Sequence, residues 1–165
     1  MRRQAGFTYL GVLFLVALMG LAMASFGTVA AMERRREREA QLLFVGHQFR
    51  RAIELYYEGS PGGMKRYPPN LDALLQDPRT PTIRRHLRRI WRDPITGQPQ
   101  WGMVEAPGGG VMGVFSLSGE KPVKRANFDG DDVDFEGKTS YSDWKFAYVP
   151  PKDGERQLPA PPLQR

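Results

Sequence analysis

An unbroken run of 26 uncharged residues, Phe7–Met32, constrains this chain more than any other feature of its sequence. As an α-helix rising ~1.5 Å per residue, the run would be about 39 Å long, which exceeds the ~30 Å hydrocarbon core of a bilayer. A short polar leader carrying Arg2 and Arg3 precedes the run, and the charged stretch 33–39 ends it. The sequence therefore predicts a transmembrane helix over residues 7–32.

The remainder of the chain is polar and contains no cysteine. In all there are 165 residues, with 18 Gly, 14 Pro and a formal net charge of +6. This length suits one small domain with an appendage rather than two sizeable cores. Without cysteine, disulfide scaffolds and thiolate metal sites are excluded.

The long helix is predicted to continue over residues 33–58 as an amphipathic segment. Its first turns carry charges of both signs and are expected to be solvated. Further along, Arg50, Arg51 and Glu54 are expected to face away from an apolar stripe. The Gly- and Pro-rich stretch 59–63 should end the helix. The stripe consists of Leu42, Val45, Phe49, Ile53 and Tyr56.

Two shorter helices are expected next, one capped by Asn70 and one running from Thr80 to Ile90. Arginines crowd the second, where the simplest interpretation is a solvated face opposite its apolar side. Docking to an acidic partner subunit is the alternative, whereas no motif for binding nucleic acid accompanies the arginines. The candidate docking residues are Arg84, Arg85, Arg88 and Arg89.

Strand patterns follow in the last third of the chain. Residues 101–105 and 111–118, joined by a Gly-rich tip, predict a hairpin, and residues 144–149 predict a third strand. Residues 59–149 would thus form the globular domain, and the Pro-rich residues 150–165 an extended tail. The expected fold class is α+β, with the long helix packed on a small antiparallel sheet.

Closely spaced carboxylates lie just before the third predicted strand. Several oxygen ligands on a Gly-containing loop suit Ca²⁺. The spacing is not that of an EF-hand, because the twelfth loop position is Ser140 rather than Glu. A solvated loop and an ion-paired contact with the arginine segment are the alternatives. The candidate calcium ligands are Asp129, Asp131, Asp132 and Asp134.

Catalytic patterns find little support in this sequence. His47 and His86 have no partner at ligand spacing, and an isolated His is usually structural or solvated. Ser116 and Ser118 lack a Gly-x-Ser-x-Gly context, and the glycines form no phosphate-binding loop. The sequence therefore predicts a protein that is not an enzyme.

Three interpretations account for the N-terminal segment: a secretory signal peptide, a plain signal anchor, and a prepilin-type leader. A signal peptide would be cut after the small residues of Ala22–Ala24, which leaves an apolar stub on the mature chain. Counting positive charges favours a cytoplasmic C-terminal domain, because four arginines follow the run and two precede it.

Residues Gly6-Phe7-Thr8-Tyr9-Leu10, followed by the uncharged run, resemble the processing site of type IV pilins and type II secretion pseudopilins. The resemblance implies that a prepilin peptidase cuts after Gly6 and that the new amino terminus of Phe7 is methylated. It also implies a single-pass protein of the bacterial inner membrane with its C-terminal domain in the periplasm, opposite to the charge count.

The resemblance continues in order along the chain. Residues 67–74 look like the Tyr-Pro segment of major pseudopilins, and residues 93–102 look like their Asp-Pro turn. Residues 114–118 look like the family's Ser-containing strand, and residues 141–144 look like its closing Asp-Trp element. The resemblance implies a pilin-like fold, partners among other pseudopilins and inner-membrane secretion proteins, and calcium in the C-terminal loops.

One position departs from the family's pattern. The fifth residue of the mature chain is normally Glu in this family, and here it is Gly11. The resemblance thus predicts a subunit of a type II secretion (general secretion pathway) pseudopilus, with a minor or tip role. A membrane-anchored periplasmic binding module and a type IV pilus minor pilin are the alternatives.

Overall fold

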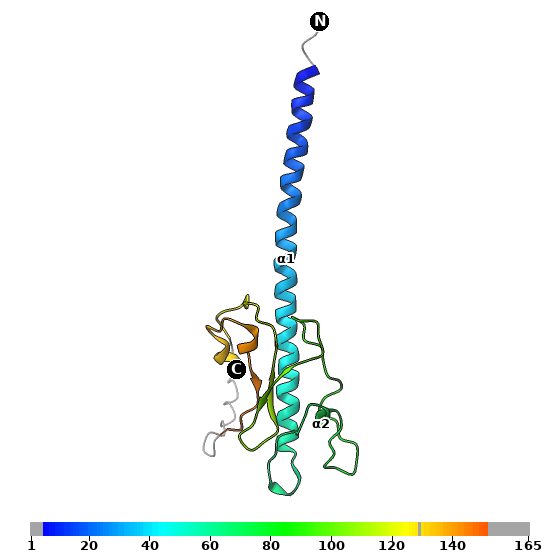
Figure 1. Ribbon diagram of the computed structural model, residues 1–165, viewed down its shortest axis with the longest axis vertical. Coiled ribbons are helices and arrows are strands. Elements are labelled where there is room, and N and C mark those ends of the chain that lie inside the picture. Colours follow the sequence, from blue (N-terminus) through cyan, green and yellow to red (C-terminus); the bar gives the residue numbers. More distant parts are fainter. Residues whose placement is uncertain (1–4, 129, 152–165) are drawn as a thin grey trace, which may run out of the picture.

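The computed structural model describes residues 5–128 and 130–151 of the chain. One helix dominates it: α1, Ala5–Glu58, has 54 residues and carries the globular domain on its C-terminal half (Figure 1). Within α1, the side chains of residues 5–7 and 21–29 lie outside the description. The helix ends where the Gly- and Pro-rich stretch begins, as predicted.

A three-stranded antiparallel sheet crosses α1, with strand order β1-β2-β3. β1 (Gly102–Glu105) and β2 (Val111–Phe115) form the predicted hairpin, and β3 (Phe146–Ala147) pairs with the other edge of β2. The hairpin and the third strand are confirmed, although all three strands are shorter than expected. The protein is an α+β protein with a long N-terminal helix and a small sheet.

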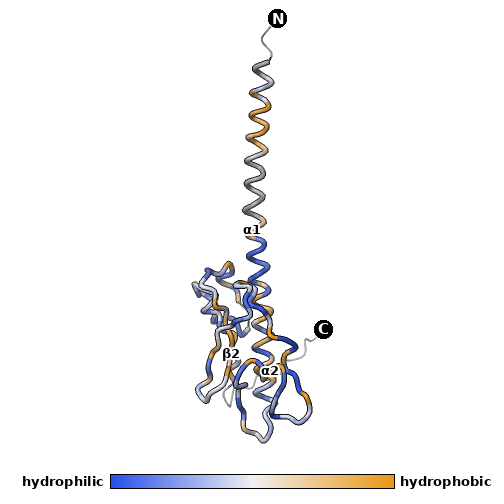
Figure 2. Tube along the Cα trace, turned by 45° about the vertical axis from the view of Figure 1, so that its right-hand side comes forward, coloured by the Kyte–Doolittle hydropathy of each residue, from blue (hydrophilic) through white to orange (hydrophobic). Residues whose placement is uncertain are grey.

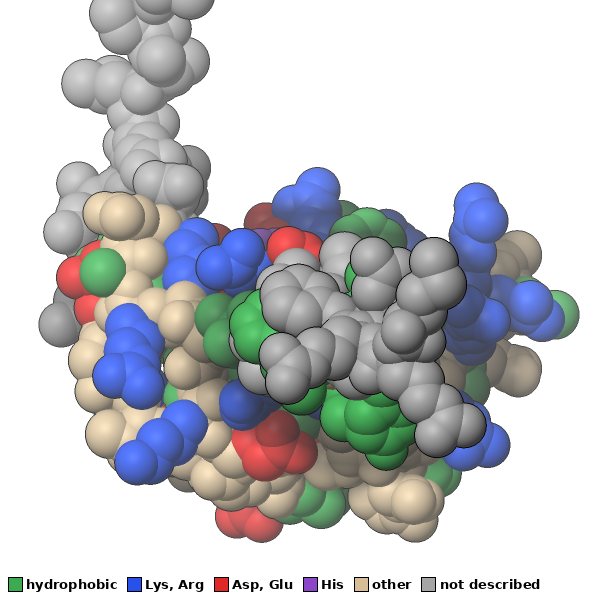
Figure 3. Space-filling view, turned by 90° about the horizontal axis from the view of Figure 1, so that it is seen from above, with side chains coloured by type: hydrophobic (Ala, Val, Ile, Leu, Met, Phe, Trp, Pro, Cys, Tyr) green, Lys and Arg blue, Asp and Glu red, His purple; other side chains and the backbone are tan. Residues whose placement is uncertain are grey.

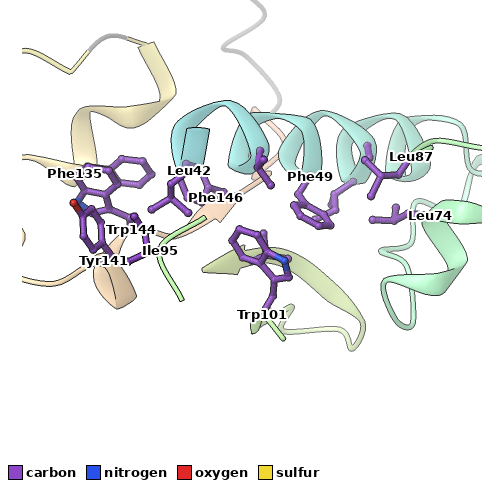
Figure 4. Close-up of a cluster of buried hydrophobic side chains, with 14 of the residues drawn as sticks. Leu42, Phe49, Leu74, Leu87, Ile95, Trp101, Phe135, Tyr141, Trp144 and Phe146 are labelled. Carbon is purple, nitrogen blue, oxygen red and sulfur yellow. The ribbon is translucent and has the colours of Figure 1, made fainter. Parts of the chain in front are cut away.

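The core lies between α1 and the sheet (Figure 4). All five residues of the predicted stripe on α1 are buried, and aromatic side chains from the sheet and loops pack against them. Gly46 allows the closest approach, because a Cβ at this position would overlap the ring of Phe146 on β3. The aromatic core residues that the sheet and loops contribute are Trp101, Phe128, Phe135, Tyr141, Trp144 and Phe146.

The loops of the domain contain several short helical segments. α2 (Asp72–Leu75) has Leu71 rather than the predicted Asn70 at its N-cap position, although the Asn70 side chain still accepts a hydrogen bond from the Ala73 amide at 3.0 Å. Three short 3₁₀ segments complete the described part of the domain: η1 (Pro61–Gly63), η2 (Gly130–Phe135) and η3 (Tyr141–Asp143).

The helix predicted from Thr80 to Ile90 is wrong: this segment is irregular throughout. Its backbone hydrogen bonds go to α2 and its flank, because the amides of His86 and Leu87 both donate to the carbonyl of Leu74. Tertiary partners therefore satisfy polar groups that a helix would have paired locally.

Arg50 also differs from its prediction: it was expected to face solvent, but it is only 8 % exposed. The turn η2 folds over this part of α1 and covers the guanidinium. Periodicity along α1 could not reveal this, because the covering residues lie more than 80 positions further along the chain.

The N-terminal half of α1 extends away from the domain, and its described apolar part is drawn in orange in Figure 2. Side chains of residues 8–20 are exposed on every side of the helix. In the part of the chain whose placement is described, no helix is both long and apolar enough to cross a membrane. The exposed large apolar residues here are Tyr9, Leu10, Val12, Leu13, Phe14, Leu15, Val16, Leu18 and Met19.

Candidate functional site

The turn η2 presents the predicted acidic cluster to α1. Asp132 is buried, and its carboxylate lies 2.6 Å from Nε2 of His47 and 2.9 Å from Nη1 of Arg50. Asp131 is mostly exposed, with an oxygen 3.8 Å from Arg50, whose guanidinium also donates to the Asp131 carbonyl. Two basic side chains of α1 therefore hold the turn in place.

Opposing effects act on the pKa of the Asp132 carboxyl. Burial alone would raise this pKa, because it disfavours the charged form. The hydrogen bond from His47 and the electrostatic attraction of His47 and Arg50 outweigh burial, so the pKa of Asp132 lies below its ordinary value. Asp132 is thus held as a carboxylate by two internal partners.

This arrangement bears on the predicted calcium site. Asp134 is exposed, and Asp129 lies outside the described residues. Among the residues that are described, no group of three or more His, Cys, Asp or Glu side chains is arranged to hold a metal ion. Asp132 already has partners on α1 and Asp129 is not described, so the calcium site stays a prediction. The turn matches the ion-paired alternative, but its partner is Arg50 of α1 rather than the arginine segment.

Calcium is expected to leave the thermal stability of the full-length protein unchanged. Arg50 already neutralises the one buried carboxylate of the turn, so a cation gains little by binding. The test compares Tm in detergent with added calcium and with chelator. A site filled at a hundredfold excess over its Kd would add about 2.7 kcal/mol, so a clear rise in Tm would overturn this expectation.

A second ionic cluster fastens the segment after α2 to the end of α1. The side chain of Asp77 is fully buried and accepts hydrogen bonds from Arg79 at 2.7 Å, and it lies 3.1 Å from Nε2 of His86. The Arg79 guanidinium lies 3.5 Å from the centre of the Tyr56 ring and donates to the Tyr56 carbonyl and the Ser60 hydroxyl. Arg79 therefore caps the C-terminal end of α1.

The sequence pattern does not predict this cluster. Arg79 directly precedes the arginine-rich segment that is expected to be solvated, and His86 is expected to be isolated. The only local signal is an acid two residues before an arginine, which is common on protein surfaces. Its burial arises from the fold, which places Tyr56 beside this segment.

Buried hydrogen bonds also join the segments on which the family resemblance rests. The Asp93 carboxylate accepts from the hydroxyls of Thr96 and Ser116, at 2.9 and 2.7 Å. The Ser142 amide donates to the Ser118 carbonyl, and the adjoining Trp144 is fully buried. The Asp-Pro turn, the Ser-containing segment that follows β2 and the closing element are thus joined by hydrogen bonds.

Exposed arginines cover the irregular segment that replaces the predicted helix. Among the described residues, none forms an ion pair with Arg84, Arg85, Arg88 or Arg89, and the guanidinium of Arg89 lies 3.9 Å from the centre of the Trp91 ring. Basic side chains project around the rim of the domain when it is viewed along α1 (Figure 3). These arginines remain available to an acidic partner.

A groove of about 630 Å³ opens between α1 and the segment that follows these arginines. Its aromatic part is formed by Phe44, which is 54 % exposed, and Trp91, whose rings meet edge to face at 6.1 Å. Arg89 and Arg92 are both exposed and also line the groove. The groove therefore combines an apolar surface with positive charge.

The predicted processing site lies at the far end of α1. The backbones of Gly6 and Phe7 are helical, whereas the leader residues 1–4, the Phe7 side chain and residues 152–165 of the predicted tail lie outside the description. Searches against known protein families, curated proteins and solved structures find no match to this chain.

Proposed function

We propose that this protein is a pseudopilin, a subunit of a type II secretion apparatus that is inserted in the bacterial inner membrane with its domain in the periplasm. The proposal combines the processing-site resemblance at Gly6-Phe7 with the shape of the molecule. A 54-residue helix carries a small domain on one half only.

The observation that carries the proposal is the exposed apolar part of α1 at residues 8–20. Residues 8–20 are exposed around the whole helix, so no single face of the protein's own domain could cover them. Exposed apolar surface of this extent requires lipid or other apolar helices around it. A pseudopilin uses both in turn: lipid while the subunit is stored, and neighbouring helices once it is assembled.

The domain half of the molecule suits a structural role. Its buried ionic groups bind to one another and hold loops onto α1, as Asp132 does with Arg50 and Asp77 with Arg79. Such contacts rigidify the surface that a neighbouring subunit would meet. We therefore propose other pseudopilins and inner-membrane assembly proteins as partners, and a prepilin peptidase as the processing enzyme.

A membrane-anchored periplasmic binding module is the second candidate, and the exposed arginines and the groove favour it. A type IV pilus minor pilin is a further alternative. It would have the same predicted leader but would assemble into a pilus rather than a secretion apparatus. Crosslinking in the presence and absence of other pseudopilins distinguishes assembly from simple binding. A binding module would give the same crosslinked products in both conditions, whereas a pseudopilin would give additional products with the other subunits.

Processing provides the direct test. We expect the mature chain to begin at Phe7, and Gly6→Val to abolish cutting because a branched side chain obstructs the peptidase at this position. Gly20→Val is the matched control: a Cβ at Gly20 meets no atom within 4 Å, so processing should be unaffected. Intact mass spectrometry of protein from a host with a prepilin peptidase gives the result. A mature terminus at Ser25 would contradict the proposal.

A further inference from the structure

The groove beside α1 is complementary in polarity and charge to the exposed surface of η2 on the same chain. On η2, Val133 is 55 % exposed, and it lies between Asp131 and Asp134, which are both exposed. An apolar side chain among carboxylates matches an aromatic groove lined by arginines, in both polarity and charge. The side chain of Asp131 is 84 % exposed, so its loose contact with Arg50 leaves it accessible.

We propose that the groove binds the acidic turn of a second copy of this chain. In this contact Val133 of one copy packs on the apolar surface that the touching rings of Phe44 and Trp91 form in the groove of the next. Asp131 and Asp134 then meet Arg89 and Arg92. The proposal rests on the proposed function, because anchoring in one membrane is what aligns the two α1 helices in parallel.

The two surfaces cannot meet within one molecule. The arginine-bearing segment and the segment that carries η2 lie on opposite sides of α1 (Figure 1). Phe44 and Arg50, which mark the groove and the turn on α1, are six residues apart. At ~100° and ~1.5 Å per residue, they lie about 120° apart around the helix and roughly 9 Å apart along it.

This placement determines the kind of assembly. Two different surfaces make a heterologous contact, which leaves one groove and one turn free on each pair. An offset along the shared axis prevents the contact from closing into a ring, so successive copies would rise in a stagger. A subunit that carries both surfaces can sit between two neighbours, which favours an internal position over a tip.

The contact is expected to be weak by itself. One apolar side chain and two rim ion pairs fall well short of the ~1,200 Å² buried in stable interfaces. Confinement in a membrane raises the effective concentration of neighbouring copies and compensates for low affinity. The test must therefore be made on the full chain in membranes.

Disulfide crosslinking can test the contact cleanly, because the chain has no native cysteine. One tagged copy carries Phe44→Cys and a differently tagged copy carries Val133→Cys. After oxidation in membranes, we expect at least about tenfold more mixed dimer than with Leu117→Cys, a control residue of similar exposure (54 %), in place of Val133→Cys. Equal yields from the two pairs would overturn the proposal.

Exchanging the charges of the groove and the turn provides a second test of the contact. Arg89→Glu in the groove copy is expected to lower the yield about tenfold, because it sets like charges together. Asp134→Arg in the turn copy should then restore the yield. Both positions are exposed, and Arg89→Gln is the control for the lost contact between Arg89 and the Trp91 ring, because it removes that contact without adding a negative charge. Failure of Arg89→Glu to lower the yield, or of the exchange to restore it, would overturn the assignment of the charges.

The two proposals fail separately. A chain that is processed at Phe7 but forms no specific Phe44–Val133 crosslink would refute this contact and leave the pseudopilin proposal standing. A chain that crosslinks as expected but is not cut after Gly6, and so keeps its apolar run, would refute the pseudopilin proposal and leave this contact standing.

Discussion

Replacing Gly11 by Glu is expected to convert a subunit that forms no filaments alone into one that does. The resemblance places an acidic side chain at this position, where it is thought to neutralise the terminal amine of a neighbouring subunit inside the helical bundle. An amine buried without a partner costs several kcal/mol even after relaxation. The sequence has no acidic residue before Glu33, about 33 Å further along α1 at ~1.5 Å per residue.

The structure allows this substitution. A Cβ at Gly11 would meet no atom within 4 Å, so the new carboxylate is free to reach a neighbour. Electron microscopy of cells that express the protein without other pseudopilins gives the readout, and Gly11→Gln is the control that matches Glu in size without its charge. Long filaments formed by the unaltered protein would refute the role of the missing acid.

The domain contact and the residue at position 11 are expected to affect different properties of the assembly: the contact between domains and the length of the filament. If η2 of one copy binds the groove of the next, unaltered subunits should form short oligomers through their domains. Their α1 helices would still lack a partner for the buried amine, which limits length. Gly11→Glu should therefore lengthen the assemblies and leave the Phe44–Val133 crosslink in place.

The largest expected effect on stability comes from Asp77→Asn. This change removes the negative charge from a fully buried side chain and leaves Arg79 without its partner. Breaking a buried ion pair in this way costs about 3–5 kcal/mol. Thermal unfolding of the full-length protein in detergent measures the loss, and Asp72→Asn, on the exposed face of α2, should change stability by less than about 0.5 kcal/mol.

The same carboxylate predicts a pH dependence. The hydrogen bond from Arg79 opposes the effect of burial and holds the pKa of Asp77 well below its ordinary value. A lowered folded-state pKa gives stability that is present above the unfolded value of ~3.9 and is lost as pH falls through the folded value. Acidification below about pH 4 should therefore narrow the difference in stability between the unaltered protein and Asp77→Asn. A difference that stays constant with pH would contradict the assignment.

Much of the architecture follows from short-range patterns in the sequence. The stripe from Leu42 to Tyr56 predicts the buried face of α1, because a helix returns to the same face every three or four residues. The Gly-rich stretch after Glu58 predicts where α1 ends, and the alternation on either side of a Gly-rich tip predicts the hairpin. Each of these signals lies within about 20 residues, where backbone geometry dominates.

The partners of the charged residues were decided only by the tertiary structure. Glu39 lies in a stretch expected to be solvated, yet it is buried and accepts hydrogen bonds from the amides of Val123 and Lys124 and from the Tyr141 hydroxyl. Likewise, Arg50 and Asp132 are separated by more than 80 residues. The residues next to a charged helix position do not indicate whether a distant loop will cover that charge.

The sequence by itself therefore determined the long helix with its apolar stripe, the end of that helix and the order of the hairpin and the closing strand. Only the tertiary structure decided that the segment from Thr80 to Ile90 is not helical and that the acidic turn binds Arg50. The physical reason is the range of the forces involved. Hydrophobic periodicity and turn preferences act between neighbours in sequence, whereas a buried charge is stabilised by whichever opposite charge the completed fold brings beside it.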